Sequence, residues 1–173
     1  KSLTGEIIDS SALLDDRGRV YVPSGDAHLY ALDRATGREL WRFRAHTPEE
    51  VEKLHGIEVF NLDWWEGNVA ILPDGTLLAG NDNYLYYRID RDTGKERGHW
   101  LGNELGWSLP ALNVRTGRAF FGTMFVALRN LFAFDVASGE KLWSNGALGS
   151  IVGSPLLTSS SADGAVVAAG FDG

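Results

Sequence analysis

Short apolar runs recur along the chain, separated by turns rich in Gly, Asp and Asn. β-branched and aromatic residues dominate the runs, which favours strands over helices. They occupy residues 20–22, 29–32, 76–79, 85–89, 119–121, 131–134 and 165–169. Because polar and apolar positions do not alternate within them, we expect sheets whose two faces are both covered.

A five-residue motif, Asp-x-x-(Thr/Ser)-Gly, follows the second run of each complete pair. It occurs at 33–37, 90–94 and 135–139. The Asp carboxylate and the hydroxyl can accept backbone N–H bonds, and the Gly takes the positive φ that closes a hairpin. Another turn precedes each pair, at 15–18, 73–75 and 113–117, and a fourth copy starts at 161–164. Similar antiparallel sheets stacked face to face around an axis form a β-propeller.

We therefore predict an all-β fold, a β-propeller segment of four-stranded antiparallel blades in a single domain, 1–173. The expected units are blade 1 at about 6–45, blade 2 at about 63–102, blade 3 at about 103–146 and a partial blade 4 at about 147–173. A blade takes roughly 40–50 residues, so the chain holds about three and a half blades, too few to close a standard ring. The remaining blades could come from the same parent chain or from a second copy. The start at Lys1 and the end within an apparent repeat favour a segment of a longer chain.

An insertion separates the first two blades. The first two motifs are 57 residues apart and the next two 45, and the surplus lies at about 46–62. Thr47 and Glu50 have capping-box spacing, Pro48 stands at the first helical position, and Gly56 can close the helix. We predict a short helix near 48–55. The insertion could cover a blade edge or take part in recognition, and the residues favour the first interpretation.

A tryptophan follows two of the motifs. Trp41 and Trp143 each stand four residues after the motif glycine, where an indole can lie on the neighbouring blade. This pattern resembles the tryptophan-docking repeat of quinoprotein-like (PQQ-repeat) β-propellers. The resemblance rests on two full matches, Ala31, Asp33, Thr36, Gly37 and Trp41 in the first copy and Ala133, Asp135, Ser138, Gly139 and Trp143 in the third. The expected structural docking residues are Asp33, Gly37, Trp41, Asp90, Gly94, Asp135, Gly139 and Trp143.

The second copy of the repeat departs from this pattern. Arg88 stands where the other copies have alanine, and Gly98 stands where they have tryptophan. Trp100, two residues later, could substitute for the missing indole through a bulge.

The resemblance implies that the first strand of each blade lines a central channel. Candidate ligand-binding residues are then Asp9, Trp65, Glu66, Asn68, Glu104 and Trp107. On a strand, Glu66 and Asn68 would point to the same face and could share a calcium ion. Quinoprotein dehydrogenases hold their PQQ with calcium, a Glu, an Asn and a catalytic Asp, so PQQ and calcium are the cofactors of that alternative. Polar residues are expected in any wet channel, which favours a channel without cofactors.

No catalytic residue is assigned. The chain contains no cysteine, whereas the family's dehydrogenases commonly carry an adjacent cysteine pair. The four histidines, at 28, 46, 55 and 99, show no pair at metal-ligand spacing and are interpreted as surface or strand residues. Residues 81–83, Asn-Asp-Asn, are interpreted as a hairpin turn rather than part of a calcium loop.

Charge and hydropathy narrow the function classes. The chain has 23 acidic and 16 basic residues and a net charge of −7, which argues against nonspecific nucleic-acid binding. No apolar stretch approaches the roughly 18 residues of a membrane span. We expect a non-enzymatic binding or scaffold module with a protein or small-molecule partner at a loop face, extracytoplasmic in bacteria by resemblance. The alternative is part of a PQQ- and calcium-dependent dehydrogenase.

Overall fold

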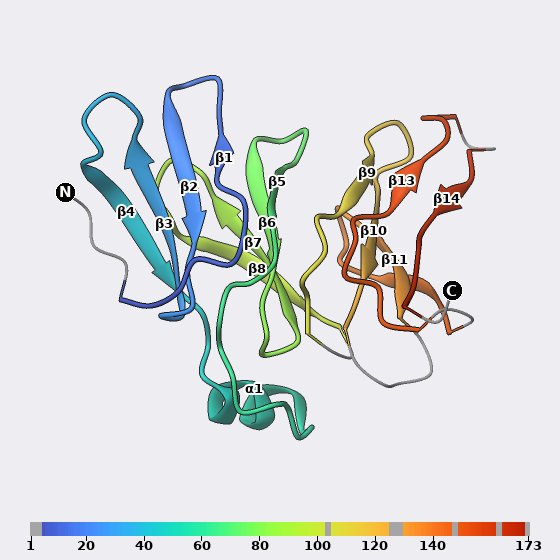
Figure 1. Ribbon diagram of the computed structural model, residues 1–173. Coiled ribbons are helices and arrows are strands. Elements are labelled where there is room, and N and C mark those ends of the chain that lie inside the picture. The colour runs from blue at the N-terminus through green and yellow to red at the C-terminus, as the bar shows by residue number, and fades with distance from the viewer. Residues whose placement is uncertain (1–4, 103–104, 125–129, 147–148, 162–163, 172–173) are drawn as a thin grey trace.

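Antiparallel sheets make up most of the protein (Figure 1). The computed structural model describes residues 5–102, 105–124, 130–146, 149–161 and 164–171. Within these ranges, three four-stranded sheets follow one another along the chain, and a two-stranded sheet comes last. Neighbours in each sheet are consecutive strands, as in propeller blades. The predicted all-β propeller segment is confirmed.

Each four-stranded sheet places its apolar runs in its second and third strands. The first sheet contains β1 (Leu13–Leu14), β2 (Arg19–Pro23), β3 (His28–Asp33) and β4 (Glu39–Arg44). The second contains β5 (Val69–Ile71), β6 (Thr76–Gly80), β7 (Leu85–Asp90) and β8 (Glu96–Leu101). The third contains β9 (Ala111–Asn113), β10 (Arg118–Gly122), β11 (Leu131–Asp135) and β12 (Lys141–Asn145). The two-stranded sheet pairs β13 (Leu156–Leu157) with β14 (Val166–Val167).

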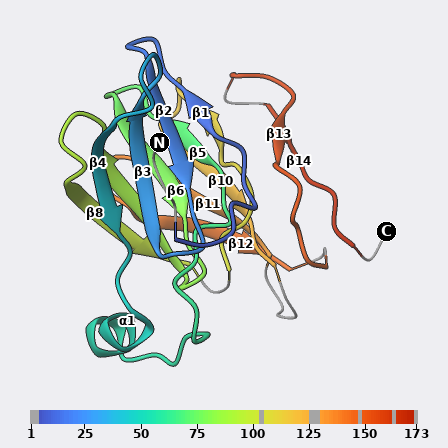
Figure 2. The same cartoon turned by 60° about the vertical axis from the view of Figure 1, so that its left-hand side comes forward.

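The second sheet is buried on both faces, which explains its continuous apolar runs. Leu77 and Tyr87 belong to a core shared with the first sheet, whereas Leu78 and Tyr86 belong to a core shared with the third. Side chains of adjacent residues on a strand point to opposite faces, so each run supplies both cores. In Figure 2 the sheets lie one behind another, with β13 and β14 set to one side.

The predicted helix is also confirmed, as α1 (Pro48–His55). The Thr47 hydroxyl accepts the Glu50 N–H at 3.2 Å, and the Glu50 carboxylate accepts the Thr47 N–H at 2.7 Å. Gly56 ends the helix with a φ of 67°. Val51 is fully buried in the core between the first two sheets and anchors the helix to them. None of the helices in the described part of the chain is long and apolar enough to cross a membrane.

The Asp-x-x-(Thr/Ser)-Gly turns have the same geometry in all three copies. Oδ1 of Asp33 accepts the Thr36 N–H at 2.8 Å and its hydroxyl at 2.6 Å, and Gly37 has a φ of 69°. These bonds favour the ionised carboxylate and lower its pKa. The same two bonds join Asp90 to Thr93 (2.8 and 2.9 Å) and Asp135 to Ser138 (2.8 and 2.9 Å).

Trp41 lies on the turn of the neighbouring sheet. Its Nε1 donates to the carbonyl oxygen of Arg91 at 3.0 Å. Its ring covers Gly94 so closely that a Cβ there would lie 2.7 Å from ring atoms. Tyr21 packs on the indole from its own sheet, at a centroid distance of 5.8 Å. The Trp41 indole therefore both packs on Gly94 and donates a hydrogen bond to the carbonyl of Arg91.

Two residues divide these contacts in the next interface. Trp100 covers Gly139, where a Cβ would lie 1.9 Å from its Nε1. Arg88 Nη1 donates to the carbonyl of Val136 at 3.4 Å. Arg88 pairs across the sheet with Gly98, as Ala31 pairs with Trp41 in the first sheet. Trp100 reaches the glycine from two residues further along the strand, and the bulge lies at the same place in both sheets.

The docking expected of Trp143 is not met within the described residues. Its side chain is 39% exposed, and it packs on Phe120 of its own sheet at a centroid distance of 5.9 Å. The sequence has no Asp-x-x-(Thr/Ser)-Gly turn after Trp143, so none of the described residues receives this indole as Gly94 receives Trp41.

Candidate functional site

A buried carboxyl group lies where the segment before β5 meets the turn between β6 and β7. Asp82 in this turn is fully buried, and its N–H donates to the carbonyl of Trp64 at 3.0 Å. Its Oδ1 accepts Nε1–H of Trp107 at 2.8 Å. Its Oδ2 has no hydrogen-bond partner among the described residues. Asp82 is thus held rigidly with one oxygen left for a proton or a cation.

The surroundings of Asp82 are acidic. Burial raises its pKa to about 7, and the negative charges of Glu66 and Asp63 act in the same direction against the Trp107 hydrogen bond. Burial also raises the pKa of Glu66, with a further contribution from Asp9. Asp82 and Glu66 therefore resist ionising together. The arrangement can retain a proton or be neutralised by a hard cation.

The structure brings some of the predicted channel residues together. Asp9 is exposed and close enough to Glu66 to act on its charge, and Trp107 contacts Asp82. Glu104 lies outside the described residues. Residues 81–83 do form a hairpin turn, but Asp82 was not predicted as a site residue. The available signal was an acidic residue at the turn position that Gly25 occupies in the first sheet.

Trp65 does not line a channel, contrary to expectation. It is fully buried, and its Nε1 donates to the carbonyl of Ala27 at 2.9 Å. Its ring packs against Tyr87 and Phe43 at centroid distances of 5.2 and 6.1 Å. The interface between the first two sheets takes up its apolar surface, which makes Trp65 a core residue.

Glu66 and Asn68 do not lie on a strand as expected, because β5 begins only at Val69. Asn68 Oδ1 accepts the Ser11 N–H at 2.9 Å and so attaches the N-terminal segment. Calcium prefers oxygen donors, and the unpartnered Oδ2 of Asp82 and the carboxylate of neighbouring Glu66 are donors of this kind. Glu66 and Asp82 therefore fit a calcium ion better than the predicted pair of Glu66 and Asn68.

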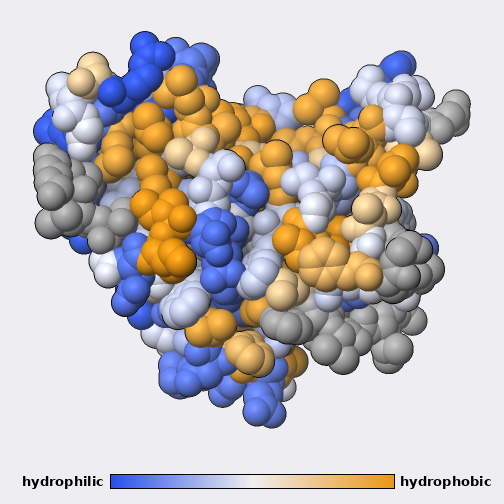
Figure 3. All heavy atoms as spheres, viewed as in Figure 1, coloured by the Kyte–Doolittle hydropathy of each residue, from blue (hydrophilic) through white to orange (hydrophobic). Residues whose placement is uncertain are grey.

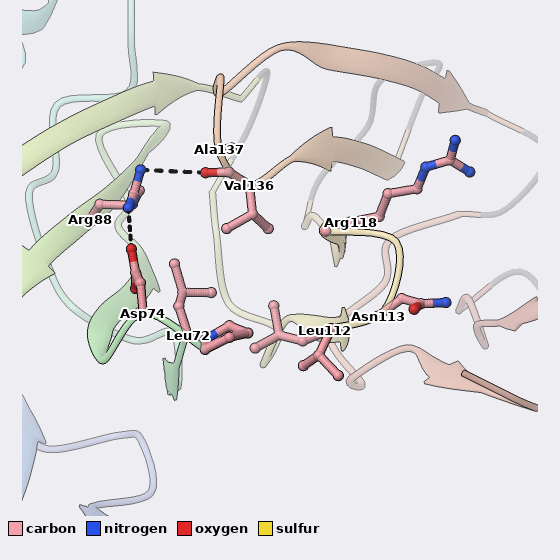
Figure 4. Close-up of a pocket in the computed structure, with 11 residues that line it drawn as sticks. Leu72, Asp74, Arg88, Leu112, Asn113, Arg118, Val136 and Ala137 are labelled. Carbon is pink, nitrogen blue, oxygen red and sulfur yellow. Dashed lines mark hydrogen bonds and ion pairs between the residues drawn. The ribbon is translucent and has the colours of Figure 1, made fainter. Parts of the chain in front are cut away.

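A cavity of ≈ 370 Å³ lies between the second and third sheets, near their hairpin turns (Figure 4). Leu72, Leu112 and Val136 make its wall largely apolar. Arg88 crosses the wall, with Nη2 bonded to Asp74 at 2.5 Å and Nη1 to the Val136 carbonyl at 3.4 Å. Its buried Nε has no partner among the described residues, which leaves one donor in an apolar wall.

The cavity follows from the changed pair in the second sheet. Ala31 and Trp41 face each other in the first sheet, and Arg88 and Gly98 take their places in the second. The flat arginine reaches the carbonyl but does not fill the volume of an indole. The departure of Arg88 and Gly98 from the repeat is visible in the sequence, but the cavity was not predictable, because the position of Trp100 on Gly139 is a tertiary contact.

Comparison with known proteins connects this geometry to a family. The family model described as "Outer membrane protein assembly factor BamB" matches residues 2–60 and 25–173. The chain belongs to this PQQ-repeat family. Membership confirms the resemblance drawn from the Asp-x-x-(Thr/Ser)-Gly and tryptophan pattern, and it accounts for the repeated four-stranded sheets.

This PQQ-repeat protein is also similar to an enzyme. The quinoprotein ethanol dehydrogenase of Pseudomonas aeruginosa is 24% identical to it over 147 residues, which cover 78% of this chain. The match covers 22% of the dehydrogenase, so the chain spans about a fifth of that relative's length.

Proposed function

We propose that this PQQ-repeat segment is a non-enzymatic, extracytoplasmic binding module that receives a protein partner at its hairpin-turn face. The cavity between the second and third sheets carries the proposal. Its volume of ≈ 370 Å³ is within the range of ligand sites and suits one large side chain with its adjoining backbone. The apolar wall takes the side chain, and the guanidinium of Arg88 in the wall favours an acidic or other oxygen-bearing group beside it.

The surface around the cavity supports a protein partner rather than an isolated small molecule. Val114, which lines the cavity, is 64% exposed. Leu156 in β13 is 68% exposed. Apolar residues gather along the upper part of the molecule in Figure 3, over the ends of the inner strands. A surface of this kind favours a peptide segment that continues beyond the cavity.

Peptide titration tests the proposal. Short peptides that end in leucine or phenylalanine carry an apolar side chain beside a carboxylate, and the matched control peptides end in a serine amide. Titrated into ¹⁵N-labelled protein, the apolar peptides are expected to shift the amide signals of Arg88, Leu112 and Val136. The control peptides are expected to leave these signals unchanged.

A cavity-filling variant makes the test specific. Leu112→Trp is expected to abolish the shifts because it occupies the cavity. Leu142→Trp, at a 38% exposed position on β12, is the matched control and is expected to keep them. Equal shifts in both variants, or shifts confined to other sheets, would contradict the proposal.

Part of a PQQ- and calcium-dependent dehydrogenase is the second candidate function. The unpartnered Asp82 Oδ2 beside Glu66 and the similarity to a quinoprotein dehydrogenase favour it. In such an enzyme PQQ supplies the oxidant, and calcium binds to oxygen donors such as these. PQQ and calcium added to the protein should then give the absorbance of bound quinone and dye-linked alcohol oxidation. Peptide binding without either signal would support the binding module alone.

A further inference from the structure

Three histidines that are far apart in the sequence meet where α1 packs on the second sheet. His46 precedes α1, His55 is its last residue, and His99 lies on β8. Nε2 of His55 and Nε2 of His99 are 3.3 Å apart. The rings of His46 and His99 meet edge to face at a centroid distance of 5.1 Å. The insertion therefore brings together imidazoles that were expected to be isolated surface or strand residues.

Glu96 joins two of these rings. Its Oε1 accepts Nδ1–H of His99 at 2.6 Å, and its Oε2 lies 3.0 Å from Nε2 of His46. One ligand atom from each of His46, Glu96 and His99 lies within 4.8 Å of the others. This group has two imidazoles and one carboxylate, and the imidazole of His55 lies against His99; these are the donor types that Zn²⁺ prefers when no thiolate is present.

The hydrogen bonds prepare His99 for a metal ion. A neutral imidazole that donates from Nδ1 to a carboxylate carries its lone pair on Nε2. Metal-binding histidines characteristically make such a bond with their other nitrogen. Glu96 therefore holds His99 in the ligating tautomer, with Nε2 directed at His55.

The spacing of the two Nε2 atoms also fits a tetrahedral ion. Zn–N bonds of about 2.0–2.1 Å place two tetrahedral ligands roughly 3.3–3.4 Å apart. The observed distance between His55 and His99 is 3.3 Å. Without an ion, Nε2–H of His55 donates to the lone pair on Nε2 of His99, because Glu96 holds the proton of His99 on Nδ1. A bound ion would take the place of that proton between the two nitrogens.

We propose that His55 and His99 bind a Zn²⁺ ion that fixes α1 to β8. Both bind through Nε2, and Glu96 positions His99 through its Nδ1–H. Water takes the remaining positions. An open hollow of ≈ 380 Å³ lined by His46, Glu50, Lys53 and Leu54 lies beside the cluster. The insertion then serves as a metal-fastened element beside the blades, a role separate from the cavity between the second and third sheets.

Metal titration of the intact protein tests this proposal. Protein stripped with EDTA and dialysed is titrated with ZnSO₄ by calorimetry, and bound zinc is counted by mass spectrometry. One ion per chain is expected. His55→Ala, at the end of α1, is expected to weaken binding by more than 100-fold. Glu96→Gln is expected to weaken it by about 10–100-fold, because it removes a positioning group rather than a ligand.

His28→Ala is the matched control, because His28 lies on β3 and bonds to Asp26 instead of the cluster. It should bind zinc like the unaltered protein. Circular dichroism of each variant checks that it folds. The absence of saturable binding, or equal affinity in His55→Ala and His28→Ala, would overturn the proposal and leave the cluster a hydrogen-bonded network.

Cobalt provides a second readout. Co²⁺ in a tetrahedral nitrogen site gives intense visible absorption, whereas octahedral hydrated Co²⁺ absorbs weakly. The substituted protein is expected to show the tetrahedral bands, and His99→Ala is expected to lose them. A spectrum like that of hydrated Co²⁺ would also overturn the proposal.

Discussion

The interface between the first and second sheets differs from the one between the second and third in how the outer strand is held. Trp41 both covers Gly94 and bonds to the Arg91 carbonyl, which also accepts Arg19 Nη1 at 2.6 Å, whereas Trp100 and Arg88 divide the two contacts in the second interface. The second interface keeps both contacts but leaves a cavity beside them. A repeat can therefore retain its docking contacts and still release volume for binding.

Surface charges add to the first interface but do not decide the difference. Arg17 and Arg19 reach Asp92 across the sheets at 2.8 and 2.6 Å, and Arg91 reaches Asp16 at 3.2 Å. Most of these side chains are partly or largely exposed, and exposed ion pairs contribute little. The two interfaces differ in whether one residue or two supply the indole packing and the carbonyl hydrogen bond.

Removing an indole should have the largest effect. Trp41→Ala and Trp100→Ala are each expected to lower the free energy of unfolding by about 3–5 kcal/mol, since both leave large gaps between sheets. Trp143→Ala serves as the control and should cost less than about 1.5 kcal/mol, because that side chain is 39% exposed. Urea unfolding followed by circular dichroism measures all three. Equal losses would show that docking does not depend on the described contacts.

Adding a side chain at a glycine that an indole covers should have the next largest effect. Gly139→Ala is expected to cost about 3 kcal/mol, because its Cβ would lie 1.9 Å from Trp100 Nε1 and its φ is 74°. Gly37→Ala shares the positive φ, but no atom lies within 4 Å of its Cβ, so about 1 kcal/mol is expected. Thermal unfolding compares the pair. Similar losses would mean that backbone strain, not the indole, sets the penalty.

The buried carboxyl group of Asp82 should make the free energy of unfolding depend on pH. The folded-state pKa of Asp82, about 7, exceeds its ordinary value, so the folded protein binds more protons between about pH 4 and 7. This contribution to stability is complete below pH 4 and is lost as the pH rises through 7. Asp82→Asn should flatten the profile in this window and add about 1–3 kcal/mol at pH 8. A variant with an unchanged profile would contradict the assignment.

Removing only the carbonyl hydrogen bond should have the smallest effect. Trp41→Phe keeps a ring against Gly94 but loses the bond to the Arg91 carbonyl, for about 1 kcal/mol. Arg88→Met loses the equivalent bond to Val136 and an ion pair with Asp74, whose side chain is 48% exposed. Arg88→Met should therefore lower the free energy of unfolding by a similar amount. A double-mutant cycle with Trp100→Ala measures how far Arg88 and Trp100 act together, and strong coupling would argue against a simple division of contacts.

Local interactions made most of the fold predictable from the sequence. The Asp33 turn and the Thr47 cap depend on residues within a few positions of each other, so spacing alone specifies them. Burial of both faces of a sheet was predictable from apolar runs in which polar and apolar residues do not alternate. The register of Arg88 with Gly98 was not predictable, because it depends on how two strands pair.

The candidate sites were less predictable because distant segments build them. Asp82 becomes a site residue only when Trp107 and Glu66 reach it, and nothing in the spacing of residues 81–83 indicates those neighbours. Trp65 was wrongly predicted to line the channel for a related reason. The side chain of a Trp just before the first strand of a sheet can point either into the core between sheets or toward the channel. The histidines meet only because α1 folds back on β8.

Burial of the second sheet on both sides has a mechanical consequence. Leu77 and Leu78 are adjacent on one strand yet belong to different cores. Close-packed interiors transmit displacement rather than absorb it. The second sheet cannot slide against one neighbouring sheet without straining its contacts with the other. A partner that widens the cavity would therefore also displace the packing on the opposite face of this sheet, under Trp41.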